Sequence, residues 1–355
     1  MTTLLRLLLK SQHQRNRSGP TQTENGMTLV ELLVGAIMAF LIITPMLGFV
    51  VDMLNTDRRE QVKSNTEQDL QAAADFISQD LSQAIYIYDN NPATISTPTT
   101  TPTGIPAIRS QLPPNGTPIL VFWKQQPRKN SIPFNPEVAK TVKPKDCDTN
   151  PGKCNDTYVL SLVAYYQIQE TDSTSIWCQP SGGTCPTRIA RYEISDGIRN
   201  PDATDPTDPY YSDTDTKDTQ QRDAAFNKDF DFSKPTEKVT TGTVFPTPEV
   251  LVNYIDHSSN AQTQLPLTEC QMALGNPKDQ KTEQPLAETA LRVTDTEGIN
   301  SFYACVDTSK NLARVTIRGN SLRRLQPNDT AYNPNKSAFF PTATVQVKGL
   351  GAIGK

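Results

Sequence analysis

Hydrophobic and polar positions are distributed unevenly along the chain, and the longest apolar run lies near the N-terminus. From Leu32 to Val51 there are twenty residues without a charge, and Thr44 is the only clearly polar one. As a helix, a run of this length spans the roughly 30 Å hydrocarbon core of a bilayer. The pattern therefore predicts a transmembrane helix over residues 27–54. Glu31 lies just inside the edge of the run, where a charge costs on the order of 3 kcal/mol and normally has a partner or a task.

A second helical pattern follows directly, over residues 55–89. Apolar or small side chains recur every three or four residues, which predicts an amphipathic continuation of the same helix. Its apolar face is formed by Val62, Thr66, Leu70, Ala73, Ile77, Leu81, Ala84 and Tyr88. Its charged face, which we expect to be solvated, carries Arg58, Glu60, Lys63, Glu67, Asp69, Asp75 and Asp80. Such an apolar face needs a folded domain to cover it.

Strand patterns dominate the rest of the chain, residues 119–355. Apolar positions alternate with polar ones over short segments, as in antiparallel strands with one buried face. The segments are 119–123, 158–168, 188–194, 250–255, 299–306, 313–317 and 343–347. An apolar helix face and an apolar sheet face each need a partner. The expected fold class is therefore α+β, with a long N-terminal helix packed on an antiparallel β-sheet and long loops between the strands.

Three segments contain few apolar residues and are predicted to lie outside regular structure. Residues 90–118 are rich in Thr and Pro and predict an extended linker. Residues 124–156 predict a long loop, and residues 196–247 predict an acidic one. In the acidic loop, Asp213, Asp215 and Asp218 are weak candidates for a calcium site, because hard cations take several carboxylates. Their spacing does not fit an EF-hand, so a solvated loop is the favoured interpretation.

A specific motif stands at the start of the apolar run. Gly26 and Met27 are followed by Thr28, by two apolar residues and by Glu31. This combination resembles the class III signal of type IV prepilins and pseudopilins. The resemblance implies that a prepilin peptidase removes residues 1–26 by cutting between Gly26 and Met27, and that Met27 is then N-methylated. Met27 departs from the phenylalanine that is usual in the family. The resemblance also implies that Glu31 pairs with the N-terminal amine of a neighbouring subunit during assembly.

The assembly role of Glu31 has a physical basis beside the resemblance. A buried carboxylate and a buried ammonium each cost several kcal/mol alone, and much less together. Further along, Pro45 and Gly48 predict a helix break, because Pro45 has no N–H to give the carbonyl of Leu41. Pilin-like helices have such a segment, which melts on packing into a filament; a harmless kink is the alternative. For the whole run, the alternative is an ordinary signal-anchor helix.

Charge predicts the topology and excludes one class of partner. Residues 1–26 contain four basic residues and one acidic residue, so the positive-inside tendency places this end in the cytoplasm. We expect a single-pass protein of the plasma membrane, with its C-terminal domain in the periplasm or on a cell-surface filament. The whole chain has a formal net charge of −4, so the part after residue 26 carries −7. This balance argues against nucleic acid as a partner.

All six cysteines lie in the predicted exterior domain. An even number in an oxidising compartment favours disulfides, although six cysteines allow about fifteen pairings. Proximity in the sequence favours Cys147–Cys154, Cys178–Cys185 and Cys270–Cys305. A zinc site is disfavoured, because there is no C-x-x-C and His257 is the only histidine of this domain.

The sequence contains no recognisable catalytic motif. There is no G-x-S-x-G, P-loop, dinucleotide fingerprint or H-E-x-x-H. Carboxylates are plentiful, but none stands out as a glycosidase-like pair. Trp123 and Trp177 are residues that can stack on sugars, yet their positions favour a core role for Trp123 and a cover over Cys178 for Trp177. We predict no enzyme activity, and no cofactor beyond the weak calcium candidate.

Several longer segments resemble particular members of the pilin-like superfamily. Segments 164–166 and 191–194 resemble the large minor subunits, the J type of type II secretion and the W type of type IV pili. Segments 40–45, 54–58 and 118–123 more closely resemble the C-type hormogonium polysaccharide secretion pseudopilins of filamentous cyanobacteria. The resemblance implies a pilin-like fold and a minor pseudopilin, the structural subunit of a filament that supports polysaccharide secretion and gliding motility.

The implied partners are the prepilin peptidase, other pilins or pseudopilins, the pilus assembly or secretion machinery and the exported polysaccharide. Two alternatives stay open. One is a tip adhesin whose loops recognise a sugar or a secreted protein. The other is a type II secretion pseudopilin that moves folded proteins.

Overall fold

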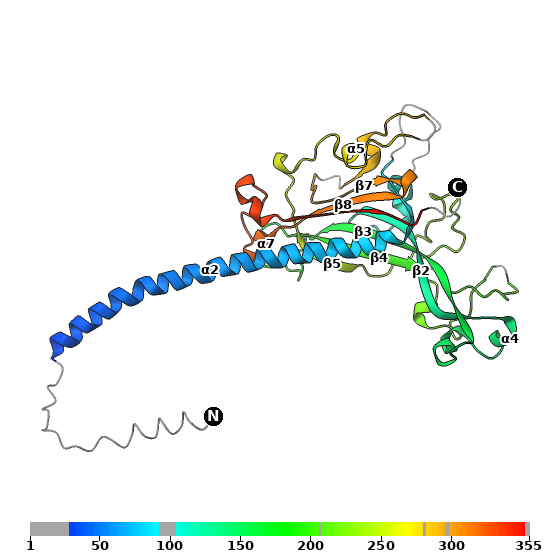
Figure 1. Cartoon of the computed structure of the whole chain (residues 1–355), viewed down its shortest axis with the longest axis horizontal. Helices are drawn as coiled ribbons and strands as arrows, with labels where there is room; N and C mark the ends of the chain where they lie inside the picture. The colour runs from blue at the N-terminus through cyan, green and yellow to red at the C-terminus, as the bar shows by residue number, and fades with distance from the viewer. Residues whose placement is uncertain (1–27, 92–103, 206, 280–281, 295–297, 352–355) are drawn as a thin grey trace, which may run out of the picture. The chain divides into compact units, whose positions relative to one another are not determined.

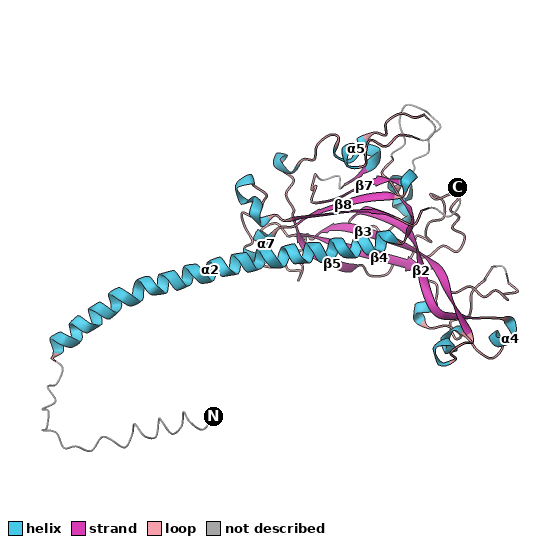
Figure 2. Ribbon diagram, viewed as in Figure 1, coloured by secondary structure: helices cyan, strands magenta, loops and turns pink. Residues whose placement is uncertain are grey.

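The computed structural model describes residues 28–91, 104–205, 207–279, 282–294 and 298–351. The chain divides into two compact units, one ending at Arg58 and the other beginning at Arg59. We call the second unit the β-rich domain. Figure 1 labels the elements in chain order, and Figure 2 distinguishes helices from strands.

One long helix and nine strands make up most of the regular structure in the described residues. The long helix is α2 (Leu29–Ser82). The strands are β1 (Ala84–Ile87), β2 (Thr117–Pro133), β3 (Cys154–Gln169), β4 (Thr187–Ser195), β5 (Glu249–Ile255), β6 (Arg292–Val293), β7 (Phe302–Asp307), β8 (Leu312–Arg318) and β9 (Thr342–Lys348). The short α-helices are α3 (Ile105–Ile108), α4 (Pro136–Ala139), α5 (Glu269–Ala273), α6 (Glu288–Leu291) and α7 (Ser321–Leu325). The 3₁₀ helices are η1 (Arg109–Gln111), η2 (Pro144–Thr149), η3 (Asp218–Gln220), η4 (Ala261–Thr263), η5 (Thr308–Lys310) and η6 (Pro334–Phe339).

α2 joins the apolar run and the amphipathic segment in one helix of 54 residues. In the β-rich domain its buried side chains are Thr66, Leu70, Ala73, Ala74, Ile77, Asp80 and Leu81. The predicted amphipathic helix is therefore confirmed, but its predicted end is wrong. The helix stops at Ser82, and Ala84–Ile87 pair with β2 as a strand. Ile85, Tyr86 and Ile87 are β-branched or aromatic, which favours pairing in a sheet over a further helical turn.

The first sheet contains five antiparallel strands in the order β1-β2-β3-β4-β5. Its longest pairing joins β2 and β3, from Thr117 opposite Gln167 to Pro133 opposite Cys154. The strand segments predicted here are confirmed, but the loop predicted over 124–156 is too long. β2 continues to Pro133 and β3 begins at Cys154, because the two strands satisfy each other's backbone groups even where their side chains are polar.

The second sheet contains four antiparallel strands in the order β6-β7-β8-β9. The helix therefore packs with two sheets instead of the single sheet expected. The sheets meet where Ile255 at the end of β5 bridges to Gly319 after β8. A side chain at residue 319 would place its Cβ 2.8 Å from Leu70 Cδ1, so glycine here allows the helix to approach closely.

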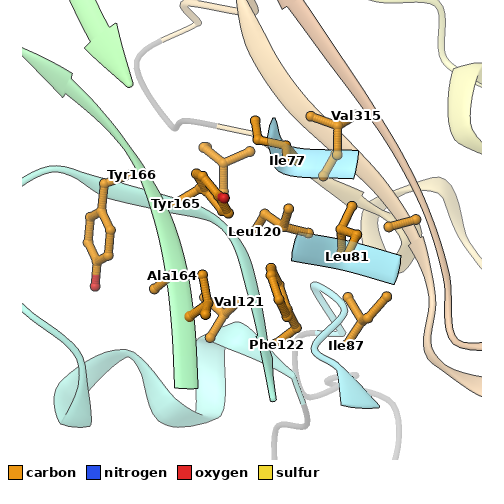
Figure 3. Packing of buried hydrophobic residues seen from close by; sticks show 14 of the residues in the cluster. Ile77, Leu81, Ile87, Leu120, Val121, Phe122, Ala164, Tyr165, Tyr166 and Val315 are labelled. Carbon is orange, nitrogen blue, oxygen red and sulfur yellow. The ribbon is translucent and has the colours of Figure 1, made fainter. Parts of the chain in front are cut away.

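The hydrophobic core lies around the C-terminal part of α2. Figure 3 shows Ile77 and Leu81 with Leu120 and Phe122 of β2 on one side and Val315 of β8 on the other. All five side chains are at most 1% exposed. The two sheets and the helix therefore share one core, and α2 provides its central contacts.

The prediction of a Thr/Pro linker over residues 90–118 is wrong for its C-terminal part. Residues 92–103 lie outside the described residues, but the part from residue 104 belongs to the β-rich domain. Ile105, Ile108 and Leu112 are buried in the main core. Their spacing of three and four residues gives α3 and η1 one apolar face, which is why this part packs instead of staying extended.

The second half of the acidic segment 196–247, from Ala225 to Phe245, packs on the face of the first sheet that is opposite to α2. Trp123 points to that face, because successive strand residues alternate and Phe122 faces the helix. Phe226, Phe230 and Phe232 pack around Trp123, with Phe230 stacked on it at 4.1 Å between ring centroids. The expectation of a solvated loop is therefore wrong for this part of the segment, and the expected core role of Trp123 is confirmed.

Candidate functional site

The first turn of α2 contains the carboxylate that the sequence singled out. Thr28 precedes the helix, and its hydroxyl oxygen accepts a hydrogen bond from the backbone N–H of Glu31 at 3.3 Å. Glu31 is exposed, and its carboxylate has no hydrogen bond or ion pair with any residue that the structure describes. Gly26 and Met27 lie outside the described residues. A carboxylate at this position also suits the positive end of the helix dipole.

The part of α2 from Leu29 to Leu54, here called the apolar segment, is exposed on every side. Leu29 is 82% exposed, Phe40 70% and Phe49 72%. A helix that is apolar all round is normally buried in a protein core or in a membrane. α2 is long and apolar enough to cross a membrane. The apolar segment therefore needs lipid or other helices around it.

Pro45 and Gly48 both lie inside α2, which continues past them to Ser82. The kink or loosening predicted at these residues stays a prediction. The missing N–H of Pro45 removes one hydrogen bond, but the bonds of neighbouring turns remain, and membrane-type helices tolerate such a residue. The hydroxyl of Thr44 donates to the carbonyl oxygen of Phe40 at 2.8 Å, which adds a local contact in the same turn.

A buried ion cluster attaches the C-terminal end of α2 to the first sheet. One carboxylate oxygen of Asp80 accepts from Lys124 Nζ at 2.9 Å. The other accepts from Arg191 Nε at 2.8 Å and from the Tyr165 hydroxyl at 2.7 Å. Glu193 completes the cluster through Lys124 at 3.0 Å and Arg191 at 2.5 Å. Two positive and two negative groups are therefore held together.

Electrostatics keeps the central carboxylate of the cluster ionised. Burial alone would raise the pKa of Asp80, but the Arg191 hydrogen bond and the charges of Lys124 and Arg191 outweigh burial and lower this pKa below its ordinary value of 3.8. Burial and the neighbouring Asp80 raise the pKa of Tyr165, so its hydroxyl remains a donor. Since the folded-state pKa of Asp80 is lowered, its stabilising effect is complete above about pH 4 and is lost as the pH falls through the folded value.

The sequence does not reveal the ion cluster. The prediction of a solvated charged face on the helix is wrong for Asp80, which is only 8% exposed. A signal was present in β4, where Arg191 and Glu193 occupy alternate positions and therefore face the same side of a strand. Charges facing the covered side of a sheet need partners, but the sequence does not indicate that Asp80 supplies one.

The calcium candidates do not form a metal site. Among the described residues, no group of three or more His, Cys, Asp or Glu side chains is placed to hold a metal ion. Asp213, Asp215 and Asp218 instead lie along a turn that leads into η3. Two backbone oxygens of this turn, those of Thr214 and Asp215, accept hydrogen bonds from Lys145 of η2. These two hydrogen bonds fix the turn to the β2–β3 connection.

Three disulfides close loops of the β-rich domain: Cys147–Cys154, Cys178–Cys185 and Cys270–Cys305. These are the pairs that proximity in the sequence favours. Trp177 lies next to Cys178 and is half-buried, with the Arg188 guanidinium 5.6 Å from its ring centroid. The loop between Cys178 and Cys185 surrounds the buried Arg323, whose guanidinium donates to the carbonyl oxygens of Thr184, Pro180 and Gly182.

His257 is the only histidine of the β-rich domain, and its environment makes the stability of the domain depend on pH in mild acid. Burial, with a smaller contribution from Arg323, lowers the pKa of His257 below its ordinary value of 6.5, although Asp256 opposes the shift. The folded state therefore favours neutral His257. We expect the free energy of unfolding to be highest above pH 6.5 and to fall as the pH decreases below it, with a slope of at most about 1.4 kcal/mol per pH unit.

This pH effect can be assigned with one variant. Denaturant unfolding of the wild type and of His257→Gln, followed by tryptophan fluorescence at pH 7.5, 6.5 and 5.5, measures the difference between the two proteins. The wild type should lose stability across this range while His257→Gln changes much less. Equal slopes in the two proteins would show that His257 is not the responsible group.

No protein-family model matches the chain, and no curated protein or solved structure is significantly similar to it. Function is therefore inferred from the residues and contacts described above.

Proposed function

We propose that the protein is a minor pseudopilin, a structural subunit of a type IV pilus-like or type II secretion-like filament that supports polysaccharide secretion and gliding motility. One observation carries the proposal. The apolar segment is exposed on every side, and a single carboxylate without a partner among the described residues stands in its first turn. This arrangement suits a helix that packs against other helices and offers one charge for pairing.

The β-rich domain supports the same interpretation. The ion cluster and the core involve only the C-terminal part of α2, from Thr66 to Leu81, while the apolar side chains of the apolar segment are exposed. The three disulfides suit an oxidising compartment outside the plasma membrane. In the proposal, the cytoplasmic leader is cut after Gly26, Met27 is methylated and Glu31 pairs with the amine of an adjacent subunit.

Mass spectrometry of the protein purified from its own cells tests the processing steps. We expect a chain that begins at Met27, carries one N-terminal methyl group and has all six cysteines oxidised. A mature chain that still begins at residue 1, or one cut within the apolar segment, would contradict the prepilin assignment. The same protein from cells without prepilin peptidase is the control and should retain residues 1–26.

Deletion of the gene separates the proposed function from its two alternatives. Loss of exported polysaccharide and gliding with normal protein secretion supports the proposal. Normal polysaccharide export and motility would contradict it, and a protein-secretion defect alone would favour a type II secretion pseudopilin. Normal export with loss of surface attachment would favour a tip adhesin.

A further inference from the structure

Two adjoining hollows lie on the β-rich domain beside the acidic segment, with volumes of about 370 and 460 Å³. Both volumes are within the range of small-molecule sites. Gly197 and Ile198 line both hollows, and we call the two hollows together the groove. A Cβ at residue 197 would lie 2.7 Å from the backbone nitrogen of Arg222, so glycine allows these two chain segments to approach each other closely.

The first hollow presents apolar surface and one prominent ring. Tyr158 of β3 lines it and is 67% exposed, beside Ile132, Leu160 and Ile198. The Tyr158 side chain has an apolar ring face and a polar hydroxyl. It is therefore suited to a ligand with an apolar face that stacks on the ring and polar groups around that face. Tyr158 does not contribute to the hydrophobic core, because most of its side chain is exposed while core residues such as Val159 are buried without it.

The second hollow is mainly polar. Asp208 and Asp213 line it, and their carboxylates make no hydrogen bond or ion pair with the described residues. Tyr210 forms a firm wall, because the guanidinium groups of Arg199 and Arg222 lie 5.6 and 5.5 Å from its ring centroid. The Tyr210 hydroxyl also donates to Asp196 at 2.6 Å. The carboxylates of Asp208 and Asp213 are therefore free to accept hydrogen bonds from a ligand, and the Tyr210 ring beside them is held in place.

These features select one class of ligand. Free carboxylates accept hydrogen bonds from hydroxyl groups and repel anions. The two arginines that line the hollows already have partners, Arg199 in Asp196 at 3.2 Å and Arg222 in the carbonyl oxygen of Phe226 at 2.8 Å. A metal ion is not favoured, because the described residues contain no group of three ligating side chains. A ligand that has an apolar face for Tyr158 and several hydroxyl donors for Asp208 and Asp213 is a neutral sugar. We propose that the groove binds a neutral oligosaccharide that extends across Gly197 and Ile198.

This inference deepens the proposed function, because it rests on a filament that handles polysaccharide and gives the chain a direct contact with it. The groove lies wholly in the β-rich domain, far along the chain from Gly26 and Glu31. Sugar binding by the isolated protein is thus measured separately from processing and assembly. A protein that fails to bind sugar but is cut at Gly26 and assembles would refute this inference alone.

Binding is tested with the full chain in a detergent that has no sugar headgroup. Isothermal titration and saturation-transfer NMR are run with neutral tetrasaccharides of glucose, mannose, galactose and xylose, and with tetragalacturonate as the acidic comparator. We expect at least one neutral tetrasaccharide to bind and the acidic one to bind more weakly. No binding of any neutral probe at millimolar concentration, or tighter binding of tetragalacturonate, would overturn the proposal.

Two variants locate the site. Tyr158→Ala removes the exposed ring and Asp208→Ala removes a free acceptor, and each is expected to weaken binding about tenfold or more, which corresponds to about 1.4 kcal/mol. Phe134→Ala is the matched control, because Phe134 is an exposed aromatic residue just after β2 that does not line the groove. Unchanged affinity in both groove variants, or an equal loss in Phe134→Ala, would place the sugar elsewhere.

Discussion

Replacing Asp80 by alanine is expected to lower the free energy of unfolding of the β-rich domain by about 3–5 kcal/mol. The reason is that Lys124 and Arg191 remain buried with only Glu193 to balance them. The side chains of Lys124 and Arg191 are only 6% and 9% exposed, so water cannot replace the lost carboxylate. Tryptophan fluorescence during urea unfolding measures the effect, because both tryptophans lie in this domain.

Two further variants test whether Asp80→Ala acts by leaving the positive charges of the ion cluster unpaired or by weakening α2 in general. Asp75→Ala changes an exposed aspartate of the same helix and should alter stability by no more than about 0.5 kcal/mol. Asp80→Ala combined with Lys124→Met removes one charge of each sign and should recover part of the loss, since Arg191 and Glu193 stay paired. A purely additive double variant would show that the two groups are not coupled.

Replacing Glu31 by alanine is expected to reduce incorporation into filaments at least tenfold while leaving cleavage after Gly26 largely intact. In the proposed assembly, the variant leaves the N-terminal amine of a neighbouring subunit buried without its partner. That penalty amounts to several kcal/mol, and each 1.4 kcal/mol corresponds to about tenfold in an equilibrium constant. Quantitative blotting of sheared filaments against the membrane fraction measures the ratio, and an unaltered filament pool would contradict the pairing role.

The structure offers a second explanation for a loss of incorporation in Glu31→Ala, and the experiment must distinguish it from pairing between subunits. Thr28 and Glu31 have the spacing of a capping box, in which the glutamate stabilises the first turn of a helix without any intermolecular contact. Glu31→Gln keeps that capping ability but removes the charge. Incorporation should stay low in Glu31→Gln if the charge pairs between subunits. Recovery to the wild-type level would mean that helix capping accounts for the residue.

Much of the fold follows from periodicity in the sequence. The alternation from Ala313 to Ile317 is clear, and the mainly apolar run from Tyr158 to Ile168 is recognisable as a strand although both faces of β3 are covered in its central part; both strands form as predicted. The outer part of β2 has no such pattern. Residues 125–128 are polar or proline and pair with residues 157–160 of β3, so this part of the strand is held by pairing that the side chains do not reveal. The end of α2 was misplaced because Ala84 continues the helical spacing.

The two functional features of α2, Glu31 and the ion cluster around Asp80, were not equally predictable from the sequence. Glu31 could be singled out because one charge stands against twenty apolar residues. Asp80 could not, since an aspartate among other charges of a helix is usually solvated, and its partners come from strands 44 and 111 residues further along the chain. The groove depends in the same way on residues from separate loops. Only tertiary structure brings such residues together.

The aromatic contacts around Trp123 have a consequence for how the protein can change in evolution. Phe226, Phe230 and Phe232 hold the acidic segment on the sheet from its middle, while Asp208 and Asp213 lie in the stretch before them and take no part in that packing. The surface residues can therefore vary while the three rings stay constant. Under the groove proposal, related chains that bind different ligands should differ most between residues 200 and 222 and keep aromatic residues at these three positions.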